Sequence, residues 1–318
     1  MQLYTINTLI ILFSLSCIIL MLRKLVTQHS NKLTLREQIK LLTSGIIAFF
    51  MDTIGVGSFA CNIALAKYFN TFKDEELPPM VNGAQIIPGA LEAFFFLGLI
   101  QVDALTLSTL IIATCLGGVL GALIISKLNA QTLRLIMLIA FPIIILLILA
   151  NHFQWIPIGG DKIALHGNEL IYGFIGLFVA GAMTAAGIGL FALVQAILFC
   201  LGMSPLVAFP IMTAAGALQQ PLSTGIFVLK NKIPLKKSLL ISLYGVVGVL
   251  LAIPVITHLS SSKLHFLLIL VLTYNTTRIG LSYLKHHRAQ HFATTPAQTH
   301  HRETSGLDPK YSPQHLNT

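Results

Sequence analysis

Charged residues are scarce in this sequence. Only 10% of its 318 residues are Asp, Glu, Lys or Arg, whereas 55% are hydrophobic. A soluble domain is about 25% charged, so the composition excludes an ordinary soluble protein. The short alternating segments of a transmembrane β-barrel are also absent. Apolar runs of about 20 residues recur along the chain, and they predict a polytopic helical membrane protein.

The motifs of several enzyme classes are absent as well. The sequence has no H-E-x-x-H string, which excludes a zinc protease of that type, and no P-loop, so transport would not be driven by nucleotide hydrolysis in this chain. An aspartyl protease needs two buried aspartates, but only Asp52 lies within an apolar run, since Asp103 lies at the end of one. Histidine is nearly absent from the apolar runs, where only His258 and His265 lie near one end. We therefore predict no enzyme activity, no cofactor and no metal site, and an intramembrane enzyme is the least favoured alternative.

Cysteine is rare and shows no pattern. The four cysteines lie singly inside apolar runs and have neither metal-ligand spacing nor a disulfide framework, so they are interpreted as small hydrophobic residues: Cys17, Cys61, Cys115 and Cys200.

The chain nevertheless carries a formal net charge of +9. Its basic residues fall in the connections between apolar runs, which indicates membrane topology rather than nucleic-acid binding. Basic clusters in connections 23–38 and 230–237 and after 285 predict a cytoplasmic side, with the N-terminus outside and the C-terminus inside. This arrangement places a smaller basic group on the outer side: Lys67, Lys73, Lys127, Arg134 and Lys263.

Nine transmembrane helices are predicted from the apolar runs. The first run lacks a basic leader and a clear cleavage site, so it is interpreted as a retained helix over residues 1–22. Residues 286–318 are polar and rich in histidine, and we expect a solvated, disordered cytoplasmic tail. The predicted spans are 3–22, 39–66, 81–101, 104–126, 132–151, 170–200, 205–229, 238–258 and 264–284.

The second half of the chain resembles the first half. Residues 51–64, MDTIGVGSFACNIA, align with residues 183–196, MTAAGIGLFALVQA, and later blocks align in the same order. The first repeat is predicted over 39–151 and the second over 170–285, with four helices in each. Four helices return the chain to its starting side, so the sequence predicts two parallel repeats after one additional N-terminal helix.

A polar stretch interrupts the apolar run 39–66. Straight helices over this run and over 170–200 would be roughly 42–46 Å long, against an apolar core of about 30 Å. We therefore predict breaks at the Gly-x-Gly strings, because glycine frees the backbone and broken helices at depth line cavities. The N-terminus of each continuing half-helix would suit an anion. Close packing of unbroken helices through glycine is the alternative.

Polar residues on the third run support a cavity. Asn82, Gln85, Gly89 and Glu92 share one helical face, and the aligned later run carries amides and hydroxyls. Interhelical hydrogen bonding alone is the alternative for these residues. We hypothesise that Asp52 or Glu92 carries a proton during transport. The predicted substrate-binding residues are Asp52, Thr53, Gly55, Gly57, Ser58, Asn82, Gln85, Glu92, Thr184, Gly187, Gly189, Gln219 and Gln220.

The segments GLFVAGAMTAAGIG (176–189), LVQAILFCLGMSPLVAF and SGIIAFFMDTIGVGSFA resemble the sulfite-exporter (TauE/SafE) family of membrane permeases. The resemblance covers about 39–285, although G-V-G-S and G-I-G-L stand where members show three successive glycines. It implies a secondary transporter of sulfite, sulfonates or related organic anions in a bacterial inner membrane, with the lipid bilayer and a small anion as its partners. A membrane scaffold without transport is the alternative.

Overall fold

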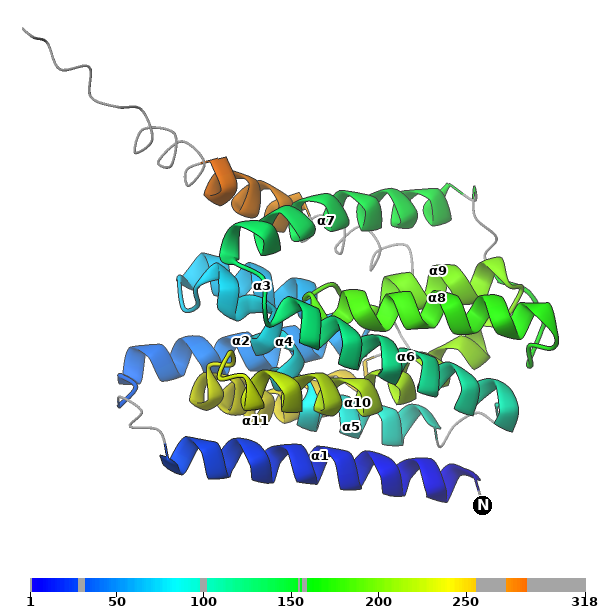
Figure 1. Ribbon diagram of the computed structural model, residues 1–318, viewed down its shortest axis with the longest axis horizontal. Coiled ribbons are helices and arrows are strands. Elements are labelled where there is room, and N and C mark those ends of the chain that lie inside the picture. The colour runs from blue at the N-terminus through cyan, green and yellow to red at the C-terminus, as the bar shows by residue number, and fades with distance from the viewer. Residues whose placement is uncertain are drawn as a thin grey trace, which may run out of the picture.

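The structure is a computed structural model that describes residues 2–27, 32–97, 102–153, 155, 159–255 and 273–284. Every named element in these ranges is a helix, and the β pairing found there is an isolated bridge between Lys162 and Met203. Figure 1 shows most helices running side by side along the long axis of the molecule. The predicted all-helical class is confirmed.

The helices follow one another with short connections. A last helical stretch covers 273–284. The predicted tail 286–318, the tail histidines, and residues His258, Lys263 and His265 lie outside the described residues. The elements are α1 (Gln2–Thr27), α2 (Leu35–Thr53), α3 (Ser58–Phe69), η1 (Asp74–Glu76), α4 (Leu77–Ala84), α5 (Ile86–Leu97), α6 (Ala104–Ile125), α7 (Ala130–His152), α8 (Asn168–Ala185), α9 (Leu190–Cys200), α10 (Pro205–Leu229) and α11 (Leu235–Ala252).

Polar side chains cap the N-termini of α2 and α6. The amide and hydroxyl of Thr34 donate to the Glu37 carboxylate, and these hydrogen bonds hold the pKa of Glu37 below its usual range. At the start of α6, the amide and hydroxyl of Thr106 donate to Asp103 and lower the pKa of that carboxyl in the same way. Both caps satisfy N–H groups that a helix start leaves without partners.

Within the described residues, five helices are long and apolar enough to cross a membrane. The bent pair η1–α4 and α5, with an angle of 41° at its break, makes a sixth. The sequence predicted a single helix over 81–101, but the chain bends beside Gln85 and the first part begins earlier. The second halves of the two interrupted runs, α3 and α9, are short, with 12 and 11 residues, and α10 carries several polar residues. The count of nine therefore stays a prediction.

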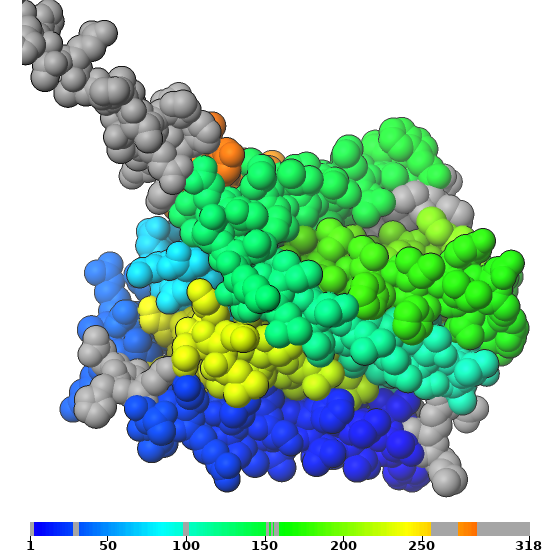
Figure 2. All heavy atoms as spheres, in the orientation of Figure 1, coloured from blue at the N-terminus to red at the C-terminus, as the bar shows by residue number. Residues whose placement is uncertain are grey.

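The outer surface of the bundle is apolar. Large hydrophobic side chains are exposed on α1, α6, α7, α8 and α11, among them Leu12, Leu116, Ile139, Ile175 and Leu250. Figure 2 shows α1 along one edge of the molecule beside α11, and α1 also contacts α5 and α10. Polar residues such as Gln219 and Glu92 are instead buried inside the bundle. An apolar exterior of this extent suits lipid as the surrounding solvent.

The predicted span 39–66 does not run from one end of the bundle to the other. It folds into a hairpin of α2 and α3, and Lys40 near its start donates to the Phe69 carbonyl at its end, with an N–O distance of 3.0 Å. The turn contains Gly55 and Gly57, whose φ angles of 98° and 96° favour glycine. Hydropathy counts apolar residues and does not register direction, so a hairpin and a crossing helix give the same signal.

The predicted span 170–200 also folds into a hairpin, formed by α8 and α9 with Gly187 (φ 89°) in the turn. Lys162 holds its two ends together, because Nζ lies 2.5 Å from Glu169 in the first turn of α8 and 3.3 Å from the Leu201 carbonyl after α9. This hairpin starts at the opposite end of the molecule from α2–α3 (Figure 1). The parallel orientation that the sequence predicted for the two aligned segments is therefore wrong.

One end of the molecule, called the basic end below, holds the start of α2, the end of α3 and the start of α11. Lys237 at the start of α11 donates to the Thr71 carbonyl with an N–O distance of 2.8 Å. Asp74 contacts Lys67 and Arg134, and Arg278 donates to the Lys67 carbonyl. The basic residues of the sequence predict opposite sides for connections 67–80 and 230–237, but the contact between Lys237 and Thr71 places both at the same end.

Glycines let two pairs of helices approach closely. A Cβ atom on Gly117 of α6 would lie 1.8 Å from the Phe178 carbonyl oxygen of α8. On α11, a Cβ atom on Gly248 would lie 2.3 Å from the Ile46 carbonyl oxygen of α2. Small residues that allow backbone-to-backbone contact are typical of helix packing in membranes. These contacts fix α8 against α6 and α2 against α11.

Candidate functional site

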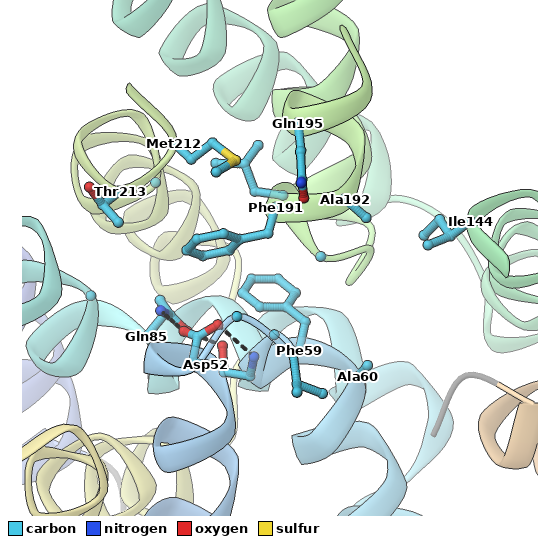
Figure 3. A pocket seen from close by; sticks show the side chains of 18 of the residues that line it. Asp52, Phe59, Ala60, Gln85, Ile144, Phe191, Ala192, Gln195, Met212 and Thr213 are labelled. Carbon is cyan, nitrogen blue, oxygen red and sulfur yellow. Dashed lines mark hydrogen bonds between the residues drawn. The ribbon is translucent and has the colours of Figure 1, made fainter. Parts of the chain in front are cut away.

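A cavity of about 70 Å³ lies where the turns of the two hairpins meet. By the same measure, one water molecule needs roughly 10–15 Å³, so a ligand of a few non-hydrogen atoms fits. Figure 3 shows side chains from both hairpins and from α10 pointing toward this space. The polar wall consists of Asp52, Ser58, Gln85, Glu92, Gln195, Thr213 and Gln220, together with glycines 55, 57, 89, 189 and 216.

Asp52 caps the first turn of α3. Its Oδ1 atom accepts the Ser58 N–H at 2.7 Å, and its Oδ2 atom accepts Gln85 Nε2 at 2.5 Å (Figure 3). The Ser58 hydroxyl donates to Gln85 Oε1, which fixes the orientation of the amide. All three side chains are buried. A negative charge at the N-terminus of a helix is favourable, so this ring of hydrogen bonds holds Asp52 in place.

Glu92 forms a second acidic position beside the first. The Thr53 hydroxyl oxygen lies 2.7 Å from Glu92 Oε1 and 2.9 Å from the Phe49 carbonyl oxygen. A threonine hydroxyl has one proton, and a carbonyl can only accept. Both contacts are therefore hydrogen bonds only when Glu92 carries a proton and donates it to Thr53. The geometry gives Glu92 a place to hold a proton next to the Asp52 carboxylate.

The turn of the second hairpin has a different cap. Gly189 is the N-cap of α9 and has no side chain with which to cap it. In the position that Asp52 occupies in the first hairpin, the second hairpin has Thr184. The Thr184 hydroxyl donates instead to the Ala180 carbonyl at 2.8 Å. Gln220 of α10 lies on the cavity wall and is 4% exposed, and its Oε1 atom has no hydrogen-bond partner among the described residues.

The rest of the wall is apolar. Phe59 and Phe191 stand at equivalent places in the two hairpins, and both line the cavity (Figure 3). Four residues of α7 close one side: Phe141, Ile144, Leu147 and Ile148. None of these residues, nor Gln195, was predicted from the sequence as part of the site. Gln195 had a signal, because it is the one polar residue in the α9 sequence LFALVQAILFC.

Eight of the thirteen predicted site residues line the cavity: Asp52, Gly55, Gly57, Ser58, Gln85, Glu92, Gly189 and Gln220.

The other five predicted residues lie behind the wall. Thr53 contacts Glu92, and Asn82 donates to the Thr184 carbonyl at 3.1 Å, which ties α4 to the second hairpin. Gly187 lies in the turn against Pro78 and Met137. Gln219 donates to Ser223 on its own helix and packs against Gly118. Thr53, Asn82, Thr184, Gly187 and Gln219 therefore support the wall without forming it.

Comparison of the chain with protein-family models, with curated proteins and with solved structures gives no match.

Proposed function

We propose that the protein is a secondary transporter of small anions such as sulfite, sulfonates or related organic anions, with transport coupled to protons. The observation that carries this proposal is the small cavity, lined in part by buried polar side chains, between two helical hairpins that start at opposite ends of an apolar bundle. Discontinuous helices that meet inside a membrane are a usual architecture for solute sites in secondary transporters. A scaffold protein has no need of a buried acidic pair at such a place.

We further propose that the chain arose by duplication and that its two halves have inverted topology. The turns make matching hydrogen bonds: Gly55 N–H to Asp52 O (2.8 Å) corresponds to Gly187 N–H to Thr184 O (2.9 Å). The packing also matches, because α2 lies against α11 of the other half, and α8 lies against α6. An inverted pair of this kind supports alternating access around a fixed central site.

Protons enter the mechanism through the acidic pair. An anion that reaches the cavity meets Asp52 and Glu92, so its approach is favourable only when at least one of these carboxyls is neutral. Glu92 with its Thr53 contact is the group placed to take up that proton. Binding of a proton would thus precede binding of the anion, which couples the two movements.

Flux measurements test this proposal. Purified protein in liposomes is expected to take up labelled sulfite faster when a proton gradient points inward. In Glu92→Gln, an amide N–H replaces the acid proton toward Thr53 and no proton can be released. Uptake by this variant is expected to lose its dependence on the proton gradient. A wild-type protein without flux of any tested anion would favour the scaffold alternative, and a gradient dependence kept by Glu92→Gln would remove Glu92 from the coupling.

We propose the cytoplasm as the location of the basic end, in a bacterial inner membrane, with the N-terminus outside and the C-terminus inside. Lys40, Lys67, Arg134 and Lys237 all lie at this end. Basic residues accumulate in cytoplasmic connections, and the hairpin topology gathers more of them on one side than a crossing helix would.

Cysteine labelling tests the hairpin topology. In a cysteine-free background, single cysteines at Asn70 and at Lys232 are expected to react with a membrane-impermeant thiol reagent from the same side, the cytoplasmic one. A cysteine at Asp161 is expected to react from the other side. Labelling of positions 70 and 232 from opposite sides would mean that the segment 39–66 crosses the membrane.

A further inference from the structure

A second pocket, with a volume of about 600 Å³, lies at the basic end between the end of α3, the start of α7 and the helical stretch 273–284. Figure 1 shows that stretch, drawn in orange, beside the start of α7, and a Cβ atom on Gly280 would lie 3.4 Å from Leu138 of α7. The pocket shares no lining residue with the cavity between the hairpin turns. Its charged lining residues are Lys67, Lys73, Asp74, Glu75, Arg134 and Arg278.

The acids of this pocket do not balance its cations. Asp74 contacts both Lys67 and Arg134, so one negative charge is shared by two positive ones. Arg278 donates to the Lys67 carbonyl with an N–O distance of 3.1 Å, and none of the described carboxylates forms an ion pair with it. A guanidinium carries five N–H groups, so most of them stay available for another acceptor. Four cations against two acids leave an excess of two positive charges, which favours an anionic ligand.

Exposed apolar side chains adjoin the cations. Leu281 lines the pocket and is exposed, and Leu135 and Ile139 are exposed on α7. Leu135 follows Arg134 directly, and Ile139 lies about one helical turn farther along α7. Basic pockets between membrane helices are typical sites for anionic lipid head groups. An apolar surface that begins beside such a pocket matches a ligand with an anionic head and hydrocarbon chains, and a soluble anion would make no use of it.

We propose that this pocket binds the phosphate group of an anionic phospholipid of the phosphatidylglycerol type, whose acyl chains lie along the exposed face of α7. Arg278 donates its available N–H groups to the phosphate oxygens, and Lys73 adds positive charge at the same pocket. The bound lipid joins α3, α7 and the stretch 273–284, so it stabilises their arrangement. The site does not depend on the proposed transport function, because it lies outside the cavity between the hairpin turns.

Melting temperatures in detergent test the site. Short-chain phosphatidylglycerol is expected to raise the melting temperature of the wild type, because a ligand of the folded state stabilises it. Phosphatidylcholine, whose choline group balances the phosphate charge, and glycerol 3-phosphate, which lacks acyl chains, are not expected to do so. In Arg278→Gln, the half-saturating concentration of phosphatidylglycerol is expected to rise about fivefold, the effect of losing one basic residue near a lipid head group.

Two further variants complete the test. Lys127→Gln is the matched control, because it removes one exposed positive charge from the connection before α7, outside the pocket, and it should respond like the wild type. Lys73→Gln covers the case in which Arg278→Gln does not fold, since Lys73 is exposed and forms no ion pair among the described residues. It is expected to weaken the response to phosphatidylglycerol in the same direction.

Three outcomes would overturn the lipid site. They are equal stabilisation by phosphatidylcholine, equal stabilisation by glycerol 3-phosphate, and a response to phosphatidylglycerol that changes no more in Arg278→Gln or Lys73→Gln than in Lys127→Gln. Equal stabilisation by glycerol 3-phosphate would identify a soluble phosphate compound as the ligand. Absence of anion uptake in liposomes, with the lipid responses as expected, would count against the transport function alone.

Discussion

Asp52→Asn is expected to remain folded and to lose most of its transport. The introduced asparagine can keep the Ser58 N–H as a donor to its Oδ1 atom, which lies 2.7 Å away in the native side chain. The amide N–H groups of the asparagine then face Gln85. The Gln85 amide can rotate by 180°, so that its oxygen accepts a hydrogen bond from the asparagine and its nitrogen donates one to the Ser58 hydroxyl. Shape and hydrogen bonding are therefore preserved, and only the charge beside Glu92 is removed.

The magnitude follows from that charge. Without a negative neighbour, Glu92 holds its proton less tightly. A loss of about 1.4–2.7 kcal/mol in proton binding corresponds to a fall in proton-driven uptake of roughly ten- to a hundredfold. Liposome uptake and the melting temperature in detergent measure the two effects separately. Asp103→Asn is the matched control, because it exchanges the same groups at a helix start outside the cavity, and it should transport normally. Wild-type uptake by Asp52→Asn would exclude Asp52 from the mechanism.

Asp52→Ala should behave differently from Asp52→Asn. It leaves both the Ser58 N–H and the Gln85 amide without their acceptor in a buried place. Each unsatisfied group costs about 1–3 kcal/mol, so this variant is expected to melt at a clearly lower temperature than Asp52→Asn. Equal stability of the two variants would contradict the hydrogen-bond ring described above.

Gly117→Ala is expected to produce the largest loss of stability. The added Cβ atom would lie 1.8 Å from the Phe178 carbonyl oxygen, and a backbone oxygen cannot rotate away as a side chain can. Overpacking usually costs about 1–3 kcal/mol, and separation of α6 from α8 would exceed the upper value. Because α8 carries the second hairpin, the loss should also abolish anion binding. The melting temperature and the yield of folded protein in detergent measure the effect.

Gly225→Ala provides the control for that substitution. Gly225 also lies within a long helix, α10, but no atom lies within 4 Å of its added Cβ position. Alanine is the better helix former by about 1 kcal/mol, so stability should stay equal or rise. Gly248→Ala, with the Ile46 carbonyl oxygen at 2.3 Å, should resemble Gly117→Ala. A stable Gly117→Ala protein would show that α6 and α8 do not pack this closely.

The sequence predicted the positions of the helices along the chain better than the directions in which they run through the bundle. Apolar runs located most of the described helices to within a few residues, although the bent pair begins at Asp74 instead of residue 81. The length of 39–66 and 170–200, together with Gly55 and Gly187, predicted the two interruptions. Direction was not predictable, because an apolar run reads the same whether the chain continues or turns back. Basic residues carried the missing information. Lys67, Lys73, Lys127 and Arg134 fit the positive-inside rule better when the first run is a hairpin.

The candidate site was predicted mainly from the first half of the chain. Polar residues on one helical face led to Gln85 and Glu92, and both line the cavity. Apolar wall residues such as Phe191 and Ile144 could not be selected, since they do not differ in type from the many apolar residues that face lipid. Gln219 was preferred equally with Gln220, but one step along a helix turns the side chain by about 100°, which places Gln219 against Gly118 instead.

The helix α4 touches both hairpins. The Asn82 side chain of α4 donates to the Thr184 carbonyl at the turn of the second hairpin. Gln85, one residue beyond the end of α4, donates to Asp52 at the turn of the first hairpin. These attachments are only three residues apart, which is roughly one helical turn. We therefore expect a displacement of one turn to shift the other through α4, because both turns are attached to the same helical turn.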